Sequence, residues 1–214
     1  LQHQDGSSHL VAATIPNCKA YDPAFAGELA VIVDAGMREM LVEQQDVFYY
    51  VTLMNENYAQ PDLPEGAAAD VLKGGYRFGR TGPEDAAQRV TLMGSGAILT
   101  EVLKAAGQLA EQGIGVDVLS ITSWSELARD GLAHGAGAHL TRLLAQTHGP
   151  VIAATDYVRA VPESVRAFVP PDRRFHTLGT DGFGRSDTRA ALRAHFQVDA
   201  DSIAARARQA LAEG

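Results

Sequence analysis

Two histidines near the start of the chain, His3 and His9, lie on either side of an Asp5-Gly6 turn. A histidine can transfer a proton near neutral pH or donate a hydrogen bond to an oxyanion, so each is a candidate for acid–base chemistry. A histidine in a terminal stretch is, however, usually solvent-exposed and inert. Residue type alone therefore assigns no role to His3 or His9.

Four further histidines show no arrangement typical of a metal site. His134, His139 and His148 lie five and nine residues apart in the least regular segment, a spacing that fits no familiar metal-ligand pattern. We therefore predict that these three are surface residues. His176 alternates along a predicted strand, which favours a structural role.

Gly94-Ser95-Gly96 lies between a predicted strand and a predicted helix, where free backbone amides could meet a phosphate. The dinucleotide fingerprint requires a third glycine, but Leu99 stands at that position. No acidic residue is convincingly placed at the end of the next predicted strand. We therefore interpret the segment as a tight turn.

The densest cluster of glycines and polar residues runs from Gly179 to Asp187. Its glycines allow sharp turns, and Ser186 could cap the following helix. Arg185, Asp181 and Asp187 could hold a ligand or a partner surface, or they could fix the loop by internal ion pairing. The sequence leaves both interpretations open.

Composition argues against several classes of function. The chain has 214 residues, 46% of them hydrophobic, which is enough for a sizeable core. Its formal net charge of -8 argues against nonspecific binding to nucleic acid. No apolar run approaches the roughly 20 residues of a membrane-spanning helix. Cys18 is the only cysteine, which fits a reducing cytoplasm.

Signatures of a self-contained active site are also absent from the sequence. It has no nucleophile elbow, no Walker phosphate loop and no zinc-binding His-Glu-x-x-His motif. We predict no cofactor-binding and no metal-binding residue in this chain. A polar start without a basic region, an apolar signal core or an initiator Met suggests a fragment of a longer protein.

The order of expected elements is an α/β pattern. After an irregular start, we predict helices over 22–44, 97–112, 157–168, 187–195 and 202–212, a short helix opening at 123–126 and one helix within 134–149, and strands over 47–53, 90–93, 116–121, 151–154 and 175–178. The glycine- and proline-rich stretch 55–82 reads as a linker.

Strands that alternate with helices favour an α/β domain with a mainly parallel sheet and helices on both faces. In such sheets, the loops at the carboxyl ends of the strands carry the functional sites. From the residues alone, we predict an α/β module that is part of a larger protein.

An ordered set of motifs gives a more specific indication. The set resembles the homodimeric type of pyruvate dehydrogenase E1, and it comprises residues 1–6, 14–18, 21–24, 49–58, 64–66, 92–99, 123–131, 154–157 and 179–187. Each piece is weak alone, but together they run in order over almost the whole chain. The segment after Gly131 looks shorter than is usual in that family.

The resemblance implies a thiamine-diphosphate enzyme that decarboxylates pyruvate and reductively acetylates a lipoyl group on its E2 partner, dihydrolipoyl acetyltransferase. It implies a cytoplasmic homodimer, with the cofactor between the first two of three domains. Residues 1–80 would be the end of the middle, pyrimidine-binding type of domain plus a linker. Residues 81–214 would be a C-terminal domain like that of transketolases.

The resemblance also implies a role for one residue. In the family, a Gln-His pair precedes an acidic-Asp-Gly turn, and that histidine faces the substrate adduct on the cofactor. Gln2 and His3 match the pair, so the resemblance makes His3 the expected catalytic residue. Gln4 stands where an acidic residue is usual, and Ser7 where a histidine is common.

The cofactor-binding motifs of the family are not found in this sequence. The metal-diphosphate motif is missing, and the glutamate that activates the thiamine ring is expected before Leu1. We therefore expect thiamine diphosphate and Mg²⁺ in the full-length enzyme, and neither cofactor nor activity in this chain alone. The alternatives are another thiamine enzyme, such as a transketolase or a 2-oxoglutarate E1, and a non-catalytic dimerisation or interaction module.

Overall fold

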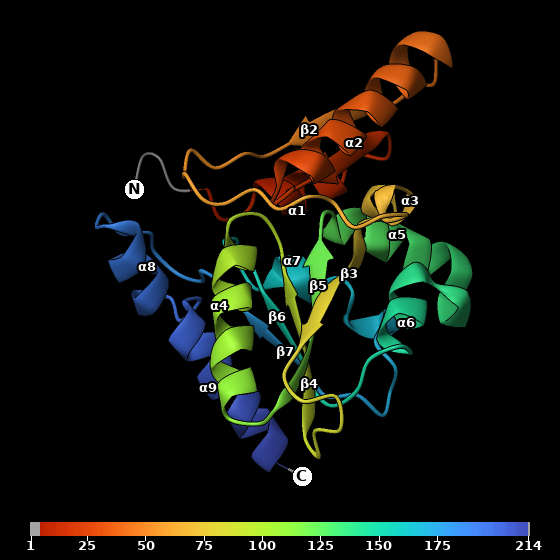
Figure 1. Ribbon diagram of the computed structural model, residues 1–214. Helices are drawn as coiled ribbons and strands as arrows, with labels where there is room; N and C mark the ends of the chain where they lie inside the picture. Colours follow the sequence, from red (N-terminus) through yellow and green to blue (C-terminus); the bar gives the residue numbers. More distant parts are fainter. Residues whose placement is uncertain (1–4, 214) are drawn as a thin grey trace.

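A computed structural model describes residues 5–213 of the chain (Figure 1). Its strands are β1 (Cys18–Tyr21), β2 (Phe48–Val51), β3 (Gly75–Thr81), β4 (Arg89–Gly94), β5 (Gly115–Ile121), β6 (Val151–Ala154) and β7 (Phe175–Leu178). Its α-helices are α1 (Ser8–Ala13), α2 (Ala26–Met37), α3 (Ala68–Leu72), α4 (Ile98–Glu111), α5 (Trp124–His134), α6 (His139–Leu144), α7 (Ala160–Glu163), α8 (Arg189–His195) and α9 (Ala200–Ala212). A π-helical turn, η1 (Arg38–Val42), continues α2, and two 3-10 turns are η2 (Gly135–Gly137) and η3 (Arg166–Phe168).

The central sheet has the strand order β3-β5-β4-β6-β7. Strands β5, β4, β6 and β7 run parallel to their neighbours, and β3 pairs antiparallel with β5 at the edge. The expected mainly parallel α/β fold is therefore confirmed. The carboxyl ends of β4, β6 and β7 lie along one edge, which is where such sheets carry their sites.

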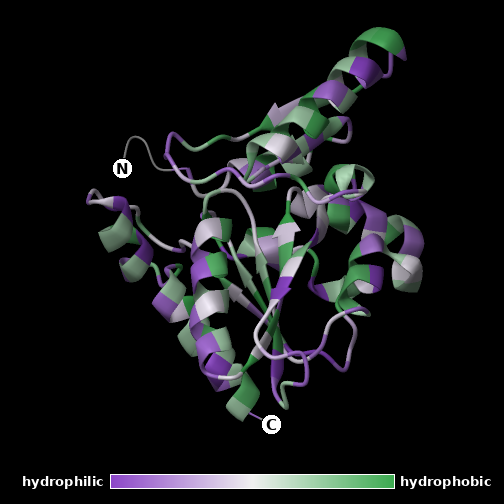
Figure 2. Ribbon diagram, viewed as in Figure 1, coloured by the Kyte–Doolittle hydropathy of each residue, from purple (hydrophilic) through white to green (hydrophobic). Residues whose placement is uncertain are grey.

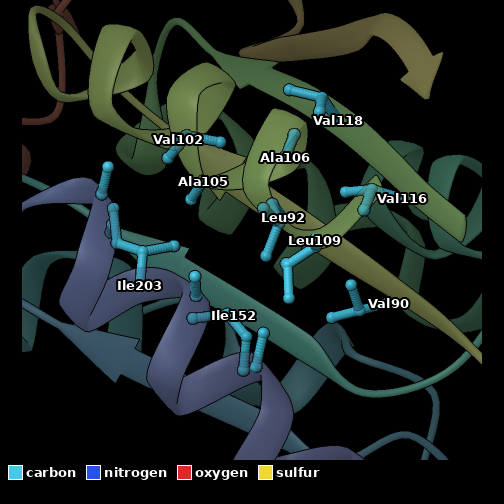
Figure 3. Close-up of a cluster of buried hydrophobic side chains, with 14 of the residues drawn as sticks. Val90, Leu92, Val102, Ala105, Ala106, Leu109, Val116, Val118, Ile152 and Ile203 are labelled. Carbon is cyan, nitrogen blue, oxygen red and sulfur yellow. The ribbon is translucent and has the colours of Figure 1, made fainter. Parts of the chain in front are cut away.

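Helices cover both faces of this sheet. On one face, α4 and α9 pack over Leu92, Val116 and Ile152 (Figure 3). On the other face, α5 and α6 pack over Met93 and Leu119. Because successive side chains point to opposite faces, both sets must be apolar, which explains the continuous apolar runs of these strands. Figure 2 shows the same distribution, with mainly hydrophobic colours on the central strands.

The first part of the chain forms a smaller unit above the end of the sheet. Strands β1 and β2 pair in parallel, from Cys18 opposite Phe48 to Tyr21 opposite Val51. Helix α2 buries Ile32 in a cluster with Tyr21 and residues of α3 and β3. The outer end of α2 and η1 extends away from the sheet (Figure 1).

A buried carboxylate joins this unit to the sheet. Glu28 on α2 is fully buried. It accepts hydrogen bonds from the backbone amides of Ala24 and Phe25, at 2.6 and 3.1 Å. Its other oxygen accepts from the Tyr76 hydroxyl on β3 and the Ser120 hydroxyl on β5, at 2.8 and 2.5 Å. One side chain thus caps α2 and ties it to two strands.

The structure corrects the predicted linker at 55–82. Helix α3 and strand β3 lie within it, and β3 pairs with β5 over its whole length. The glycines mark close packing: a Cβ on Gly75 would meet the Ile121 side chain at 2.9 Å, and one on Gly74 would meet the Ser123 carbonyl at 2.4 Å. The expected division of the chain at residue 80 stays a prediction, and β3 crosses it.

Other boundaries also differ from the prediction. The first 18 residues contain α1 and the start of β1, where an irregular segment was expected. The helix predicted from Asp22 begins at Ala26, and the one predicted over 157–168 is the short α7 followed by η3. In the part of the chain that the structure describes, no helix is long and apolar enough to span a membrane.

Candidate functional site at the carboxyl ends of the strands

Asp22 stands directly after β1, at the junction between the smaller unit and the sheet. Its side chain is buried. Its carboxylate accepts hydrogen bonds from the Thr52 hydroxyl at 2.8 Å and from the Ser95 hydroxyl at 2.9 Å. Burial raises the pKa of Asp22 to about 7, although these two hydrogen bonds lower it in part. The sequence predicted the start of a helix at Asp22, but this carboxylate binds side chains of other elements.

A chain of polar contacts extends from Asp22 to the start of α1. The His9 ring nitrogen Nε2 lies 2.9 Å from the Thr52 hydroxyl oxygen. Because the Thr52 hydroxyl donates to Asp22, the imidazole is assigned as the donor to Thr52. Burial lowers the pKa of His9 to about 4, and the Asp5 carboxylate opposes this shift. His9 is thus a buried, neutral imidazole, and the expectation of an exposed terminal histidine is wrong.

The same segment is held to the sheet domain by further contacts. The Gly6 carbonyl accepts a hydrogen bond from the Val158 amide at 2.9 Å. Asp5 accepts from the Ser8 amide at 3.0 Å. The His9 ring packs edge-on against Tyr157, with centroids 4.6 Å apart. The backbone from Asp5 to His9 is therefore fixed. The predicted catalytic residue, His3, lies outside the described residues.

Gly94-Ser95-Gly96 is a tight turn, as interpreted from the sequence. The Gly96 amide donates to the Asp22 carbonyl at 2.9 Å, and Gly96 has a positive φ of 50°. A Cβ on Gly96 would lie 2.6 Å from the Asp22 carboxylate, so only glycine fits there. Ser95 also lies 3.2 Å from the Thr155 hydroxyl after β6. The turn encloses a carboxylate of its own chain, which explains its glycines without a phosphate.

The Asp22→Asn substitution is expected to change how stability depends on pH. The pKa of Asp22 is near 3.8 when unfolded and about 7 when folded, so the folded state binds the proton more tightly. The contribution of the Asp22 carboxyl to the free energy of unfolding is fully present below about pH 3.8. It is lost as the pH rises to about 7. Asparagine keeps the shape without this loss. From pH 5 to pH 7, the variant should gain on the order of 2–3 kcal/mol relative to wild type.

Thermal or denaturant unfolding of both proteins at several pH values measures this difference. Above about pH 8 the two stability curves should run parallel, because Asp22 is then ionised in both the folded and the unfolded state. If the difference in free energy of unfolding between the two proteins stayed constant from pH 5 to pH 7, the raised pKa of a buried Asp22 would be contradicted.

A cavity of about 690 Å³ opens beside this network. Its walls come from the segment after β2, from Asp156 and Tyr157 after β6, from the 179–187 loop after β7, and from α8. Burial raises the pKa of Asp156, while Arg193 opposes the shift. Asp5 also lines the cavity, two residues after His3 in the sequence.

Helix α8 is attached to the segment after β2 by ion pairs. Arg193 is buried and contacts the carboxylates of Glu56 and Glu101, at 2.5 and 3.3 Å. Arg189 donates to the Asn55 side chain. Asn55 and Glu56, which carry part of the family resemblance, thus hold one wall of the cavity in place.

The loop from 179 to 187 shows the internal ion pairing that was one of the two interpretations left open by the sequence. Asp181 accepts hydrogen bonds from the Arg159 backbone amide, at 2.8 Å, and from its guanidinium, so part of the loop is fixed by internal pairing. Arg185 instead lines the cavity. Phe183, at the tip of the loop, is 96% exposed.

The remaining histidines are only partly as predicted. His134 and His148 are exposed, as expected. His139 is buried, and its Nε2 lies 2.7 Å from the Gly75 carbonyl oxygen, so its assignment to the surface is wrong. Gly75, which contacts His139, is on β3, and this strand was predicted to be part of a linker.

Comparison with protein families identifies the fold. Residues 74–199 match the family described as the transketolase-like TK C-terminal domain. The chain belongs to this family. Residues 1–61 match a second description, the pyruvate dehydrogenase E1 component middle domain.

Curated relatives named pyruvate dehydrogenase E1 component align with all or nearly all of this chain. The chain is 48% identical over 225 residues to the pyruvate dehydrogenase E1 component of Pseudomonas aeruginosa, covering 100% of this chain and 25% of the relative. It is 46% identical to that of Escherichia coli K12, covering 95% of this chain and 24% of the relative. The predicted resemblance to this family is confirmed. The chain spans about a quarter of the length of these relatives.

Solved structures show the same architecture. The transketolase from Leishmania mexicana superposes with a TM-score of 0.68 at 18% identity, covering 99% of this chain and 28% of that one. The transketolase from Campylobacter jejuni gives 0.69 at 18% identity, with 97% and 28% covered. At this identity the likeness concerns the fold alone, and it confirms the predicted transketolase-like domain.

Proposed function

We propose that this chain is a portion of a pyruvate dehydrogenase E1 subunit. The parent protein would decarboxylate pyruvate on thiamine diphosphate and reductively acetylate the lipoyl group of an E2 dihydrolipoyl acetyltransferase. It would act as a cytoplasmic homodimer. The observation that carries the proposal is the 48% identity, across the whole chain, to a protein named pyruvate dehydrogenase E1 component.

The residues described here do not fit the cofactor site by themselves. Among residues 5–213, no three His, Cys, Asp or Glu side chains gather as a divalent cation site requires. The proposal therefore assigns thiamine diphosphate and Mg²⁺ to parts of the parent protein beyond the quarter that this chain covers. The cofactor supplies the stabilised carbanion chemistry of decarboxylation.

The role proposed for this chain is to carry and support His3. A histidine at that position would donate a hydrogen bond where negative charge develops on the reacting substrate. The fixed backbone from Asp5 to His9 supports this role. Through Thr52, Asp22 and Ser95, that segment is tied to the carboxyl ends of β1 and β4. A buried network of this kind limits the movement of the residues it holds.

An assay of the parent protein beside the isolated 214-residue chain tests the proposal. With pyruvate, thiamine diphosphate and Mg²⁺, the parent protein should release CO₂ and reduce an artificial electron acceptor, and the isolated chain should do neither. Turnover by the isolated chain would contradict its assignment as an incomplete part. No turnover by the parent protein would contradict the proposed function.

A further inference from the structure

The cavity beside Asp156 has the size and position of a ligand site. Its volume of about 690 Å³ is within the range of small-molecule pockets, about 300–1,000 Å³. It lies past the carboxyl ends of β6 and β7, where open α/β sheets bind their ligands. Asp156 and Thr180, each two residues past the end of its strand, both line it.

Part of the cavity lining is apolar. Leu53 and Met54, from the segment after β2, contribute to the lining, as do Leu192 and Phe196 from α8 and the following turn. Leu53 and Met54 are exposed by 62% and 42%. Exposed side chains of this size gain stability when an apolar group covers them.

Within the part of the chain that the structure describes, Arg185 is the arginine of the cavity lining without a side-chain partner. The other two arginines in the lining, Arg189 and Arg193, contact Asn55 and Glu56. Among residues 5–213, Arg185 has no hydrogen bond or ion pair with another side chain. The two acids of its own loop are engaged elsewhere: Asp181 pairs with Arg159, and Asp187 accepts from the Thr188 amide at 2.7 Å.

The two carboxyl groups of the cavity lining, Asp5 and Asp156, have partners other than Arg185. Asp5 accepts two hydrogen bonds from Ser8, so its charge is turned toward the start of α1. Burial raises the pKa of Asp156, and the Arg193 and Arg189 guanidinium groups lower it, so these two arginines face the Asp156 carboxyl. The Ser186 hydroxyl, next to Arg185, adds a further donor to the lining.

We propose that this cavity binds a small organic anion with an apolar body. The anionic group binds the Arg185 guanidinium, and the body lies against Leu53, Leu192 and Phe196. Guanidinium binds carboxylate and phosphate through paired N–H donors, so an anion of this geometry is favoured. Pyruvate has only a methyl group to offer the apolar side, so the ligand is a larger molecule. This proposal does not rest on the role proposed for His3.

Binding of 4-(trifluoromethyl)benzoate to the parent protein, followed by ¹⁹F NMR, tests the proposal. This probe combines a carboxylate with an apolar body, and 4-(trifluoromethyl)benzamide is its neutral counterpart. The carboxylate should bind at one site per chain, and the amide about tenfold more weakly or not at all. The readout needs no turnover, so it is independent of the proposed enzymatic function.

Two matched variants locate the site. Arg185→Ala should weaken binding of the benzoate about tenfold, because it removes a charge-assisted hydrogen-bond pair. Arg208→Ala removes an exposed arginine on α9, away from the cavity lining, and should leave the affinity unchanged. Both arginines are exposed, so neither change should disturb the fold.

Several outcomes would overturn the proposal. They are the absence of binding, equal binding of benzoate and benzamide, and equal losses in the two variants. Displacement of the probe by pyruvate at concentrations that saturate turnover would also overturn it, because the probe would then occupy the substrate site.

Discussion

Replacing Glu28 with alanine is expected to destabilise the chain by about 3–5 kcal/mol, because four buried hydrogen-bond donors lose their acceptor. Glu28 is fully buried and accepts four hydrogen bonds. Its removal leaves the Tyr76 and Ser120 hydroxyls and two backbone amides without this partner in the interior. Each buried donor left in that way costs about 1–3 kcal/mol, part of which relaxation recovers.

Denaturant unfolding measures this effect against two further variants. Glu28→Gln keeps one acceptor oxygen and should lose about half as much, since its amide group cannot accept from the remaining donors. Glu111→Ala, an exposed position at the end of α4, should change stability by less than about 0.5 kcal/mol. A loss for Glu28→Ala no larger than that for Glu111→Ala would show that the network does not hold the two units together.

The second large effect is expected on catalysis. In the parent protein, His3→Ala should lower the rate of pyruvate decarboxylation about 10²–10⁴-fold, the usual contribution of a positioned acid–base or hydrogen-bonding group. His3 is proposed to act at the substrate, and the described backbone from Asp5 to His9 is fixed by hydrogen bonds. A loss confined to kcat, with cofactor binding unchanged, would indicate a group that acts in the transition state.

The control for this variant is His148→Ala. His148 is exposed and lies beside Gly149, far along the chain from α1. Its replacement should leave the rate and the unfolding temperature unchanged. If His3→Ala keeps the wild-type rate while folding normally, His3 has no catalytic role and the chain serves as structural support.

Elements with strong local patterns were predictable from the sequence. The apolar strands β4, β5, β6 and β7, and the helix α4 that ends before Gly113, lie within about two residues of their expected positions. Their side chains face two apolar layers, so the pattern is continuous and long. Strand β3 was missed because Gly75 and Gly79 read as chain breakers, while its stability comes from pairing with β5.

The site was less predictable, because its contacts join distant parts of the chain. Asp22 and Ser95 are separated by 73 residues, and His9 and Thr52 by 43. Next to Pro23, Asp22 has the local signature of a helix cap, and nothing nearby in the sequence shows that it is buried. The one available signal was the glycine on each side of Ser95, which indicated a close approach but not its partner.

The most direct test of the proposed function is a comparison of substrates by the parent protein. The rate of thiamine-diphosphate-dependent turnover would be measured with pyruvate, with 2-oxoglutarate and with a ketose phosphate. The proposed function predicts that kcat/KM for pyruvate exceeds the kcat/KM values for the other two substrates by at least about 100-fold. This corresponds to a difference of about 2.7 kcal/mol in transition-state stabilisation. A preference for 2-oxoglutarate or for the ketose phosphate would contradict it and would indicate one of the other thiamine enzymes of the same fold.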